Sequence, residues 1–127
     1  MSSAPSKYDN IYVGFSFWLA DKIHGDIISP EMWSLLLTIE KSRSLSDAAR
    51  KMGISYRKAW DMVRRCEEAL GFNLFIKSRG GRDGGITTLS ADGEELVAAY
   101  HNLIKNIEPV FEQHIKLFKR TLKGKRI

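Results

Sequence analysis

Apolar residues recur at helical spacing in three successive segments in the first two thirds of the chain. Each segment follows a serine, whose hydroxyl can accept a free backbone N–H at the start of a helix. A glycine follows the second and third segments, as is common where helices end. The pattern therefore predicts helices over about residues 30–42, 45–52 and 56–70, preceded by Ser29, Ser44 and Ser55.

The second and third of these helices carry more detailed signals. Ser44 and Asp47 have the spacing of a capping box, in which each side chain accepts the other residue's backbone N–H, although Asp replaces the commoner Glu. The third helix has apolar residues at steps of four, three and four, which predicts one face turned to a core. That face consists of Ala59, Val63, Cys66 and Leu70.

Two stretches have the composition of β-hairpins. Residues 11–28 are rich in β-branched and aromatic types, and we expect Ala20–Lys22 to form the turn between two short strands. Leu74–Ile76 and Ile86–Leu89 predict a second pair of strands. The four glycines among residues 80–85 predict an exposed loop between them.

The last part of the chain predicts one long helix from about Ser90 to beyond Ile115. Its apolar positions alternate between steps of four and three, which is the pattern of a coiled-coil seam. Pro109 is expected to kink or split this helix, because proline removes a backbone hydrogen bond. The expected dimer interface is Leu96, Tyr100, Leu103, Ile107, Val110, His114 and Leu117.

These elements predict a mainly α fold with short strands. It is a winged helix-turn-helix with an N-terminal β-hairpin and a long C-terminal dimerisation helix. The expected divisions are a flexible N-terminus over 1–10, the winged helix-turn-helix domain over 11–89, a dimerisation helix over 90–122 and a basic tail over 123–127.

The charge distribution changes the picture further. The net charge of the 127 residues is +5, but residues 43–82 hold ten Lys or Arg against four Asp or Glu. Residues 116–126 hold six Lys or Arg and no acid, whereas the rest of the chain has four against eleven. Such segregation favours a polyanionic partner. A solvated charged face is the alternative.

The helix, tight turn and helix from Ser44 to Leu70 have the outline of a helix-turn-helix, whose second helix enters the DNA major groove. Arg57 can donate two parallel N–H groups to a guanine edge, and Lys58 can reach phosphate or guanine. The candidate DNA-binding residues of these helices are Ser46, Ser55, Tyr56, Arg57, Lys58, Trp60, Asp61 and Arg64.

Two of these candidates have alternative roles. Trp60 either contacts a thymine methyl group or supports the wing. Arg64 either contacts DNA or pairs with Glu67 and Glu68 on its own helix. In the wing, Lys77, Arg79 and Arg82 are expected to reach the DNA backbone or the minor groove.

Other classes of function lack their signals. His24, His101 and His114 are scattered, so we expect no catalytic centre, metal site or cofactor. The glycine-rich loop lacks the Lys-Ser/Thr of a nucleotide-binding loop. Cys66 is the single cysteine, and neither a secretion signal nor a membrane-spanning run is visible, so we expect a cytoplasmic protein.

Several motifs together resemble the N-terminal domain of the ModE family of molybdate-responsive regulators. They are the run Ser44–Asp61 with its Ser-Tyr-Arg-Lys-Ala-Trp-Asp motif, the Phe17–Leu19 strand, the Gly80–Gly85 wing and the Thr88–Glu94 helix opening. The stretch Ala69–Phe75 resembles instead the related LysR-type regulators.

The resemblance implies a winged helix that binds DNA through its third helix and wing, and that dimerises through its last helix. ModE proteins carry further domains that bind molybdate, so molybdate binding is not expected from this chain alone. We expect a homodimer bound to a near-palindromic double-stranded operator. The alternatives are a LysR-like module without its effector domain and a winged-helix protein-interaction module without specific DNA binding.

Overall fold

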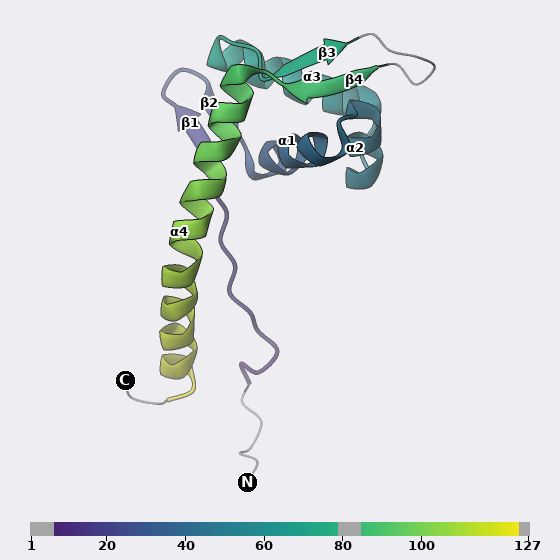
Figure 1. Ribbon diagram of the computed structural model, residues 1–127. Coiled ribbons are helices and arrows are strands. Elements are labelled where there is room, and N and C mark those ends of the chain that lie inside the picture. The colour runs from purple at the N-terminus through teal and green to yellow at the C-terminus, as the bar shows by residue number, and fades with distance from the viewer. Residues whose placement is uncertain (1–6, 79–84, 125–127) are drawn as a thin grey trace. The chain divides into compact units, whose positions relative to one another are not determined.

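The computed structural model describes residues 7–78 and 85–124 (Figure 1). The chain divides into two compact units. The larger unit, residues 16–98, contains all the short elements and the beginning of the last helix. The smaller unit joins residues 1–15 to residues 99–127, which include the rest of that helix.

Three helices form the centre of the larger unit: α1 (Pro30–Ser42), α2 (Leu45–Met52) and α3 (Tyr56–Leu70). Each begins as the sequence predicts. The hydroxyls of Ser29, Ser44 and Ser55 accept the backbone N–H groups of Met32, Asp47 and Lys58. The helices end at residues in the left-handed conformation, which are Arg43, Gly53 and Gly71.

Only one of the two hydrogen bonds of the predicted capping box forms at α2. Ser44 accepts from the N–H of Asp47, but the carboxylate of Asp47 binds Arg50 Nη2 at 2.6 Å instead of reaching back. The N–H of Ser44 lies 3.4 Å from Ser42 Oγ. Aspartate is shorter than glutamate, and a cation one turn ahead offers it a stronger partner.

The core of the larger unit is built around α1. Its side chains at Leu35, Leu36 and Ile39 are fully buried. The other buried side chains of the helices α2 and α3 are Leu45, Ala48, Ala49, Ala59, Val63 and Cys66. Ile28, Leu74 and Val97 are buried beside them. Leu70, which the sequence places on the same face, is only half-buried.

The first hairpin pairs β1 (Leu19–Asp21) with β2 (Gly25–Ile28). The turn lies at residues 22–24, so the prediction of Ala20–Lys22 was wrong, and residues 11–18 form no strand. The carboxylate of Asp21 causes the shift, because it accepts the N–H groups of Ile23 and His24 and closes the turn beyond itself. The bond from His24 lowers the pKa of Asp21.

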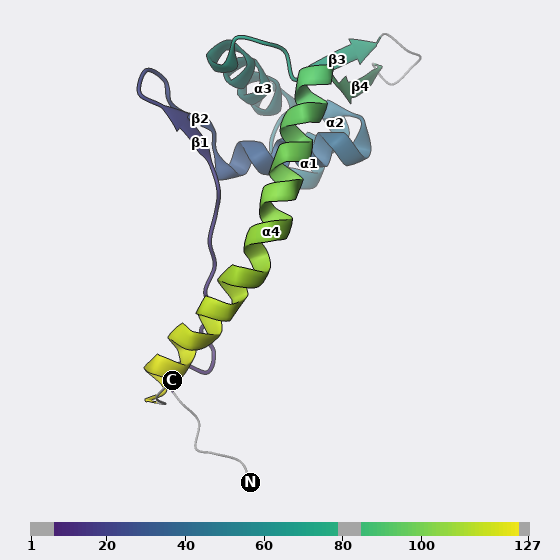
Figure 2. The ribbon, with the colours of Figure 1, turned by 60° about the vertical axis from the view of Figure 1, so that its left-hand side comes forward.

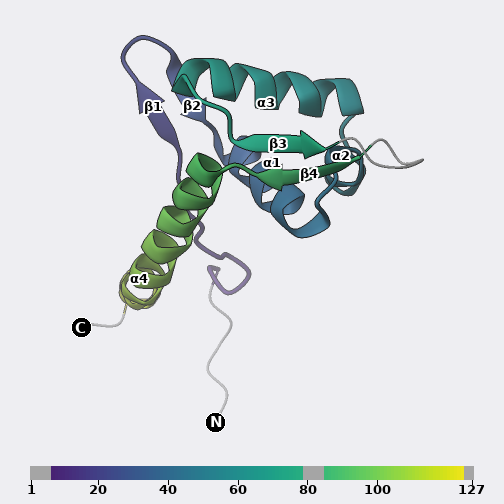
Figure 3. The ribbon, with the colours of Figure 1, turned by 45° about the horizontal axis from the view of Figure 1, so that its top comes forward.

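The second hairpin pairs β3 (Phe75–Ser78) with β4 (Ile86–Leu89) in an antiparallel register from Phe75↔Leu89 to Ser78↔Ile86. The strand prediction of Leu74–Ile76 was too early, because Glu67 Oε2 accepts the N–H groups of Leu74 (2.6 Å) and Phe75 (3.2 Å). In Figure 3 this hairpin and α3 lie side by side.

Helix α4 (Ala91–Leu122) begins at a tightly bonded junction. Ser90 Oγ donates to the carbonyl of Asn73 and accepts the N–H of Gly93, while the N–H of Ser90 donates to the carbonyl of Leu74. Gly93 lies so near that carbonyl that a Cβ atom would stand 2.2 Å from it. The junction therefore needs both a hydroxyl and a bare backbone.

Pro109 does not split α4, which continues as one helix from residue 91 to residue 122. In the smaller unit an N-terminal segment, residues 7–15, runs beside the second half of α4 (Figures 1 and 2). The rings of Phe15 and Phe111 lie 4.1 Å apart, and Lys123 Nζ lies 3.4 Å from Asp9 Oδ1.

Candidate nucleic-acid interface

Helix α3 presents one face to solvent because the opposite face fills the core. Ala59, Val63 and Cys66 point inward at intervals that leave the intervening residues free. The DNA-binding residues predicted for this helix and its N-cap lie within residues 55–64, on the solvent-exposed side. Ser55, Tyr56, Arg57, Lys58, Trp60 and Arg64 are exposed and Asp61 is half-buried.

The cations of α3 differ in what they already contact. Lys58 Nζ lies 3.3 Å from the carboxylate of Glu31 on α1. Arg64 lies 3.0 Å from Glu68 and 3.9 Å from Asp61. Exposed pairs of this kind are weak, and a phosphate can replace the carboxylate.

Arg57, in contrast, forms no ion pair or hydrogen bond with any residue in the described ranges. All its donors therefore remain free for a ligand.

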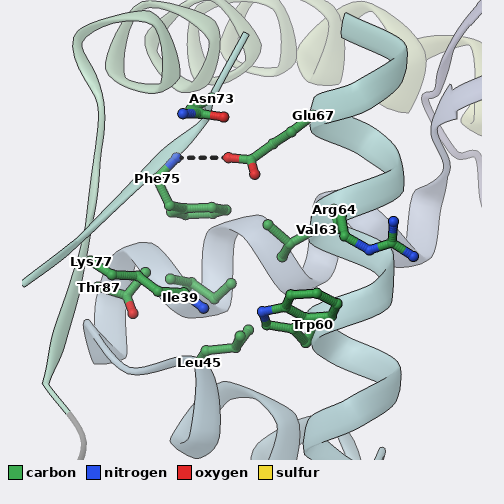
Figure 4. Close-up of a pocket in the computed structure, with 10 residues that line it drawn as sticks. All are labelled: Ile39, Leu45, Trp60, Val63, Arg64, Glu67, Asn73, Phe75, Lys77 and Thr87. Carbon is green, nitrogen blue, oxygen red and sulfur yellow. Dashed lines mark hydrogen bonds between the residues drawn. The ribbon is translucent and has the colours of Figure 1, made fainter. Parts of the chain in front are cut away.

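Trp60 of α3 lies beside the second hairpin, and 41% of its surface is exposed. Its indole borders a pocket of about 190 Å³ and supports the guanidinium of Arg64 at 5.3 Å from the ring centroid (Figure 4). The lining residues are Ile39, Leu45, Trp60, Val63, Arg64, Glu67, Asn73, Phe75, Lys77 and Thr87. The position agrees with a support for the hairpin and leaves one face of the ring accessible.

A groove of about 310 Å³ brings three predicted residues from three elements together. Ser46 comes from the start of α2, Tyr56 from the start of α3 and Lys77 from β3. Thr87, which is 7% exposed, also lines this groove. Two hydroxyls and an ammonium group on one concave surface can bind a phosphate from several directions.

A neighbouring groove of about 680 Å³ contains two arginines that the sequence analysis did not select, Arg43 and Arg50. Arg43 is the C-cap residue of α1, with φ at 57°. Its backbone carbonyl accepts the N–H of Thr87 in β4. The basic surplus of residues 43–82 was the available signal. It did not show that this arginine lies beside the second hairpin.

The wing is only partly described. Lys77 is exposed on β3, where no described residue forms an ion pair with it. Arg79 and Arg82 lie outside the described residues, so their predicted contacts stay predictions.

The predicted dimer seam follows α4 over most of its length. Leu96, Tyr100, Leu103 and Leu117 are half-buried, whereas Ile107, Val110 and His114 are exposed. Ile107 and Val110 expose 39% and 55% of their surface, and Phe118 nearby exposes 52%. The apolar stripe is therefore most open in the middle of the helix.

The residues that suggest other chemistry lie apart. Cys66 is 3% exposed in the core, and its burial raises the pKa of the thiol to about 12. Within residues 7–78 and 85–124, histidine, cysteine and acidic side chains form no cluster that could hold a metal. No helix in the same ranges has the length and apolarity to cross a membrane.

Comparison with known proteins identifies the family of this scaffold. The family model described as bacterial regulatory helix-turn-helix protein, lysR family, matches residues 31–94, which run from the start of α1 into α4. The chain belongs to the lysR family. The matched region contains all the described candidate DNA-binding residues of α2, α3 and β3.

Curated proteins similar to this lysR-family chain include a molybdenum-pterin-binding protein and a transcriptional regulator. The chain is 38% identical over 76 residues to the molybdenum-pterin-binding protein MopB of Rhodobacter capsulatus, covering 60% of the chain and 28% of MopB. It is 32% identical over 94 residues to the dual regulator ModE of Escherichia coli K12, covering 74% of the chain and 35% of ModE. The match spans about a third of these relatives.

Solved structures confirm the winged-helix fold. A BenM DBD complex with benA site 1 DNA aligns with a TM-score of 0.51 and 22% identity, covering 72% of this chain and 92% of that one. Vibrio fischeri DarR in complex with DNA aligns with a TM-score of 0.51 and 20% identity, covering 68% of this chain and 28% of DarR.

Proposed function

We propose that this chain is a sequence-specific DNA-binding transcriptional regulator that acts as a homodimer on near-palindromic double-stranded DNA. One observation supports this above the others. The starts of α2 and α3 and strand β3 supply Ser46, Tyr56 and Lys77 to one groove, beside the exposed Arg57. Family membership and the DNA-bound relatives of the same fold support the same conclusion.

The groups divide by chemistry into two roles. Arg57 reads a base, because a free guanidinium can donate two parallel bonds to a guanine edge. Ser46, Tyr56 and Lys77 bind phosphate and fix the position of α3 along the duplex without reading sequence. Arg43 and Arg50 extend this phosphate-binding surface along the neighbouring groove.

The open stripe on α4 supports dimerisation through residues 90–122. Exposure of Ile107, Val110 and Phe118 to water is unfavourable, and a second copy of the helix can bury these side chains. A two-fold dimer presents two identical recognition helices, so the operator should be nearly palindromic.

Selection of bound sequences from a random pool of DNA duplexes tests the proposal directly. We expect an enriched motif with two inverted half-sites, and an affinity for it that falls steeply with salt. Recovery of unenriched sequences with the same affinity would favour nonspecific binding. No DNA binding at low salt would favour the protein-interaction module.

We propose that the chain works by binding and not by catalysis, in the cytoplasm with the DNA it regulates. We also propose that it binds DNA without molybdate. A doubly charged oxyanion needs several convergent donors in a partly dry pocket. The described cations of α3 and β3 are all exposed instead.

Calorimetric titration with molybdate at physiological salt, with sulfate as the comparison, tests this second point. We expect neither anion to bind tightly, because salt screens exposed cations. Tight and selective binding of molybdate would contradict it and would point to a site formed at a dimer interface.

A further inference from the structure

The N-terminal segment, residues 11–15, has the composition of a strand but no strand beside it. Ile11, Tyr12, Val13 and Phe15 are β-branched or aromatic, as in edge strands. The backbone of residues 12–15 forms no hydrogen bond with any residue that the structure describes. The preceding N–H, that of Ile11, closes a short turn onto the carbonyl of Tyr8.

One side of this segment faces its own chain. Phe15 packs on Phe111 at 4.1 Å between ring centroids, and Val13 is half-buried. Tyr12 is 86% exposed, and nothing lies within 4 Å of a Cβ atom built on Gly14. Phe15 still exposes 46% of its surface and Ile11 50%, so the contact with α4 leaves much of the segment open.

The open stripe of α4 adjoins this segment, because Ile107 and Phe118 lie four residues before and seven residues after Phe111, on the same face of the helix. The segment contacts α4 at Phe111 and Lys123. Val110, which is 55% exposed, precedes Phe111 by one residue and therefore lies about 100° around the helix. The strand-like segment and the apolar stripe thus belong to one continuous surface of the smaller unit.

We propose that residues 11–15 pair as an edge strand with the same residues of a second copy of this chain, beside the α4 seam. The inference rests on the homodimer of the proposed function and specifies its interface. An unpaired edge is a template for another strand. In a two-fold dimer a segment that meets itself across the axis must run antiparallel, which gives a symmetric two-stranded ribbon.

The partner is a second copy of this chain, because the apolar stripe of α4 and residues 11–15 are neighbours and need one partner that covers both. A partner helix on Ile107 and Val110 brings the partner's own N-terminal segment with it, since that segment is attached to its α4 through Phe15 and Asp9. An unrelated protein would have to match both an apolar helix and a free strand edge.

Proline substitutions test the backbone pairing. Neighbouring N–H groups of a strand point to opposite edges, so Tyr12→Pro and Val13→Pro remove one donor from each edge. Tyr12→Ala and Val13→Ala are the matched controls, because they truncate the same side chains and keep the N–H. We expect one proline variant to dimerise at least ~10-fold more weakly than its alanine control, measured by sedimentation without DNA.

Symmetric crosslinking tests the proximity of the two segments. Gly14→Cys in a Cys66→Ala background places one thiol on the exposed side, where the Cβ atom meets nothing. A short bis-maleimide crosslinker should give a covalently linked dimer, since antiparallel pairing of residues 11–15 with themselves sets the two thiols on a diagonal about 8 Å apart, too far for a direct disulfide. Ser34→Cys, exposed on α1, is the control and should remain largely uncrosslinked.

The outcomes separate this inference from the proposed function. A wild-type monomer would overturn the homodimer and the strand pairing together. A dimer that Ile107→Glu dissociates, but that neither proline variant weakens and Gly14→Cys does not crosslink, would overturn the strand pairing alone. Loss of DNA binding with an intact crosslink would overturn only the DNA-binding proposal.

Discussion

The two units of this protein differ in how far each one buries its own apolar surface. Among the described residues, all the buried apolar side chains lie between Ile28 and Val97, inside the larger unit. In the smaller unit no described apolar side chain is buried, and Tyr12, Val110 and Phe118 are more than half exposed. The larger unit thus has a core of its own, whereas the smaller one leaves its apolar side chains partly exposed.

The largest effect on the smaller unit is expected from a substitution in the middle of α4. Ile107→Glu places a charge where the proposed dimer buries an apolar side chain, so we expect a monomer. DNA affinity should fall about 100-fold or more, because two half-sites are no longer bound together. Sedimentation and a DNA titration measure the two effects.

Lys105→Glu, an exposed charge change on α4 outside the seam, is the control for Ile107→Glu. Circular dichroism should show the same helical content in both variants. A dimeric Ile107→Glu variant with full DNA affinity would contradict the role of the stripe.

The core of the larger unit can be tested where α4 begins. Gly93→Ala sets a Cβ atom 2.2 Å from the carbonyl oxygen of Leu74, which cannot move without breaking its bond to Ser90. We expect a loss of about 1–3 kcal/mol in the free energy of unfolding, measured with urea. Gly14→Ala is the matched control, because nothing lies near its Cβ position, and it should be nearly neutral.

Within the larger unit, base reading can be separated from phosphate binding. Arg57→Ala should cost about 1–3 kcal/mol on the best site and relax the preference at one position. Lys77→Ala should weaken all sequences alike and reduce the salt slope by about one unit. Equal losses on specific and random DNA for both variants would remove Arg57 from base reading.

The buried thiol gives the finest test of the core. Burial raises the pKa of Cys66 from 9.0 to about 12, so the unfolded chain releases this proton at lower pH than the folded chain does. The stabilising contribution is complete below pH 9.0 and is lost as pH rises toward about 12. The slope is at most about 1.4 kcal/mol per pH unit.

The matched variant for this measurement is Cys66→Ala. The difference in unfolding free energy between wild type and Cys66→Ala should be constant below pH 9.0 and shrink above it. Because lysine and tyrosine titrations affect both proteins, the difference isolates the thiol. A difference that stays constant at alkaline pH would show that the thiol is not held in its neutral form.

Local signals explain why so much of the larger unit could be predicted. Helix starts at Ser29, Ser44 and Ser55 depend on a hydroxyl and an N–H three residues later, which the sequence shows directly. Ends at Gly53 and Gly71 need only a residue that accepts positive φ. These contacts span fewer than five residues and need no knowledge of the fold.

Two of the differences from the prediction come from contacts between distant residues. Glu67 and Glu68 were both alternative partners of Arg64. Glu68 pairs with Arg64, but Glu67 binds the N–H groups of Leu74 and Phe75 across the α3–β3 loop. Arg43 joins the candidate site only because its carbonyl bonds to Thr87 of β4. The sequence alone shows no spacing that brings such partners together.

The junction between β4 and α4 also determines how this chain can change in evolution. At position 90 the hydroxyl both donates and accepts, so Thr can replace Ser, whereas Ala, Asp and Val each lose at least one of the two bonds. At position 93 even a methyl group collides with a main-chain oxygen. A saturation mutagenesis screen should therefore show two narrowly restricted positions three residues apart, with the exposed Ala91 and Asp92 between them accepting many residue types.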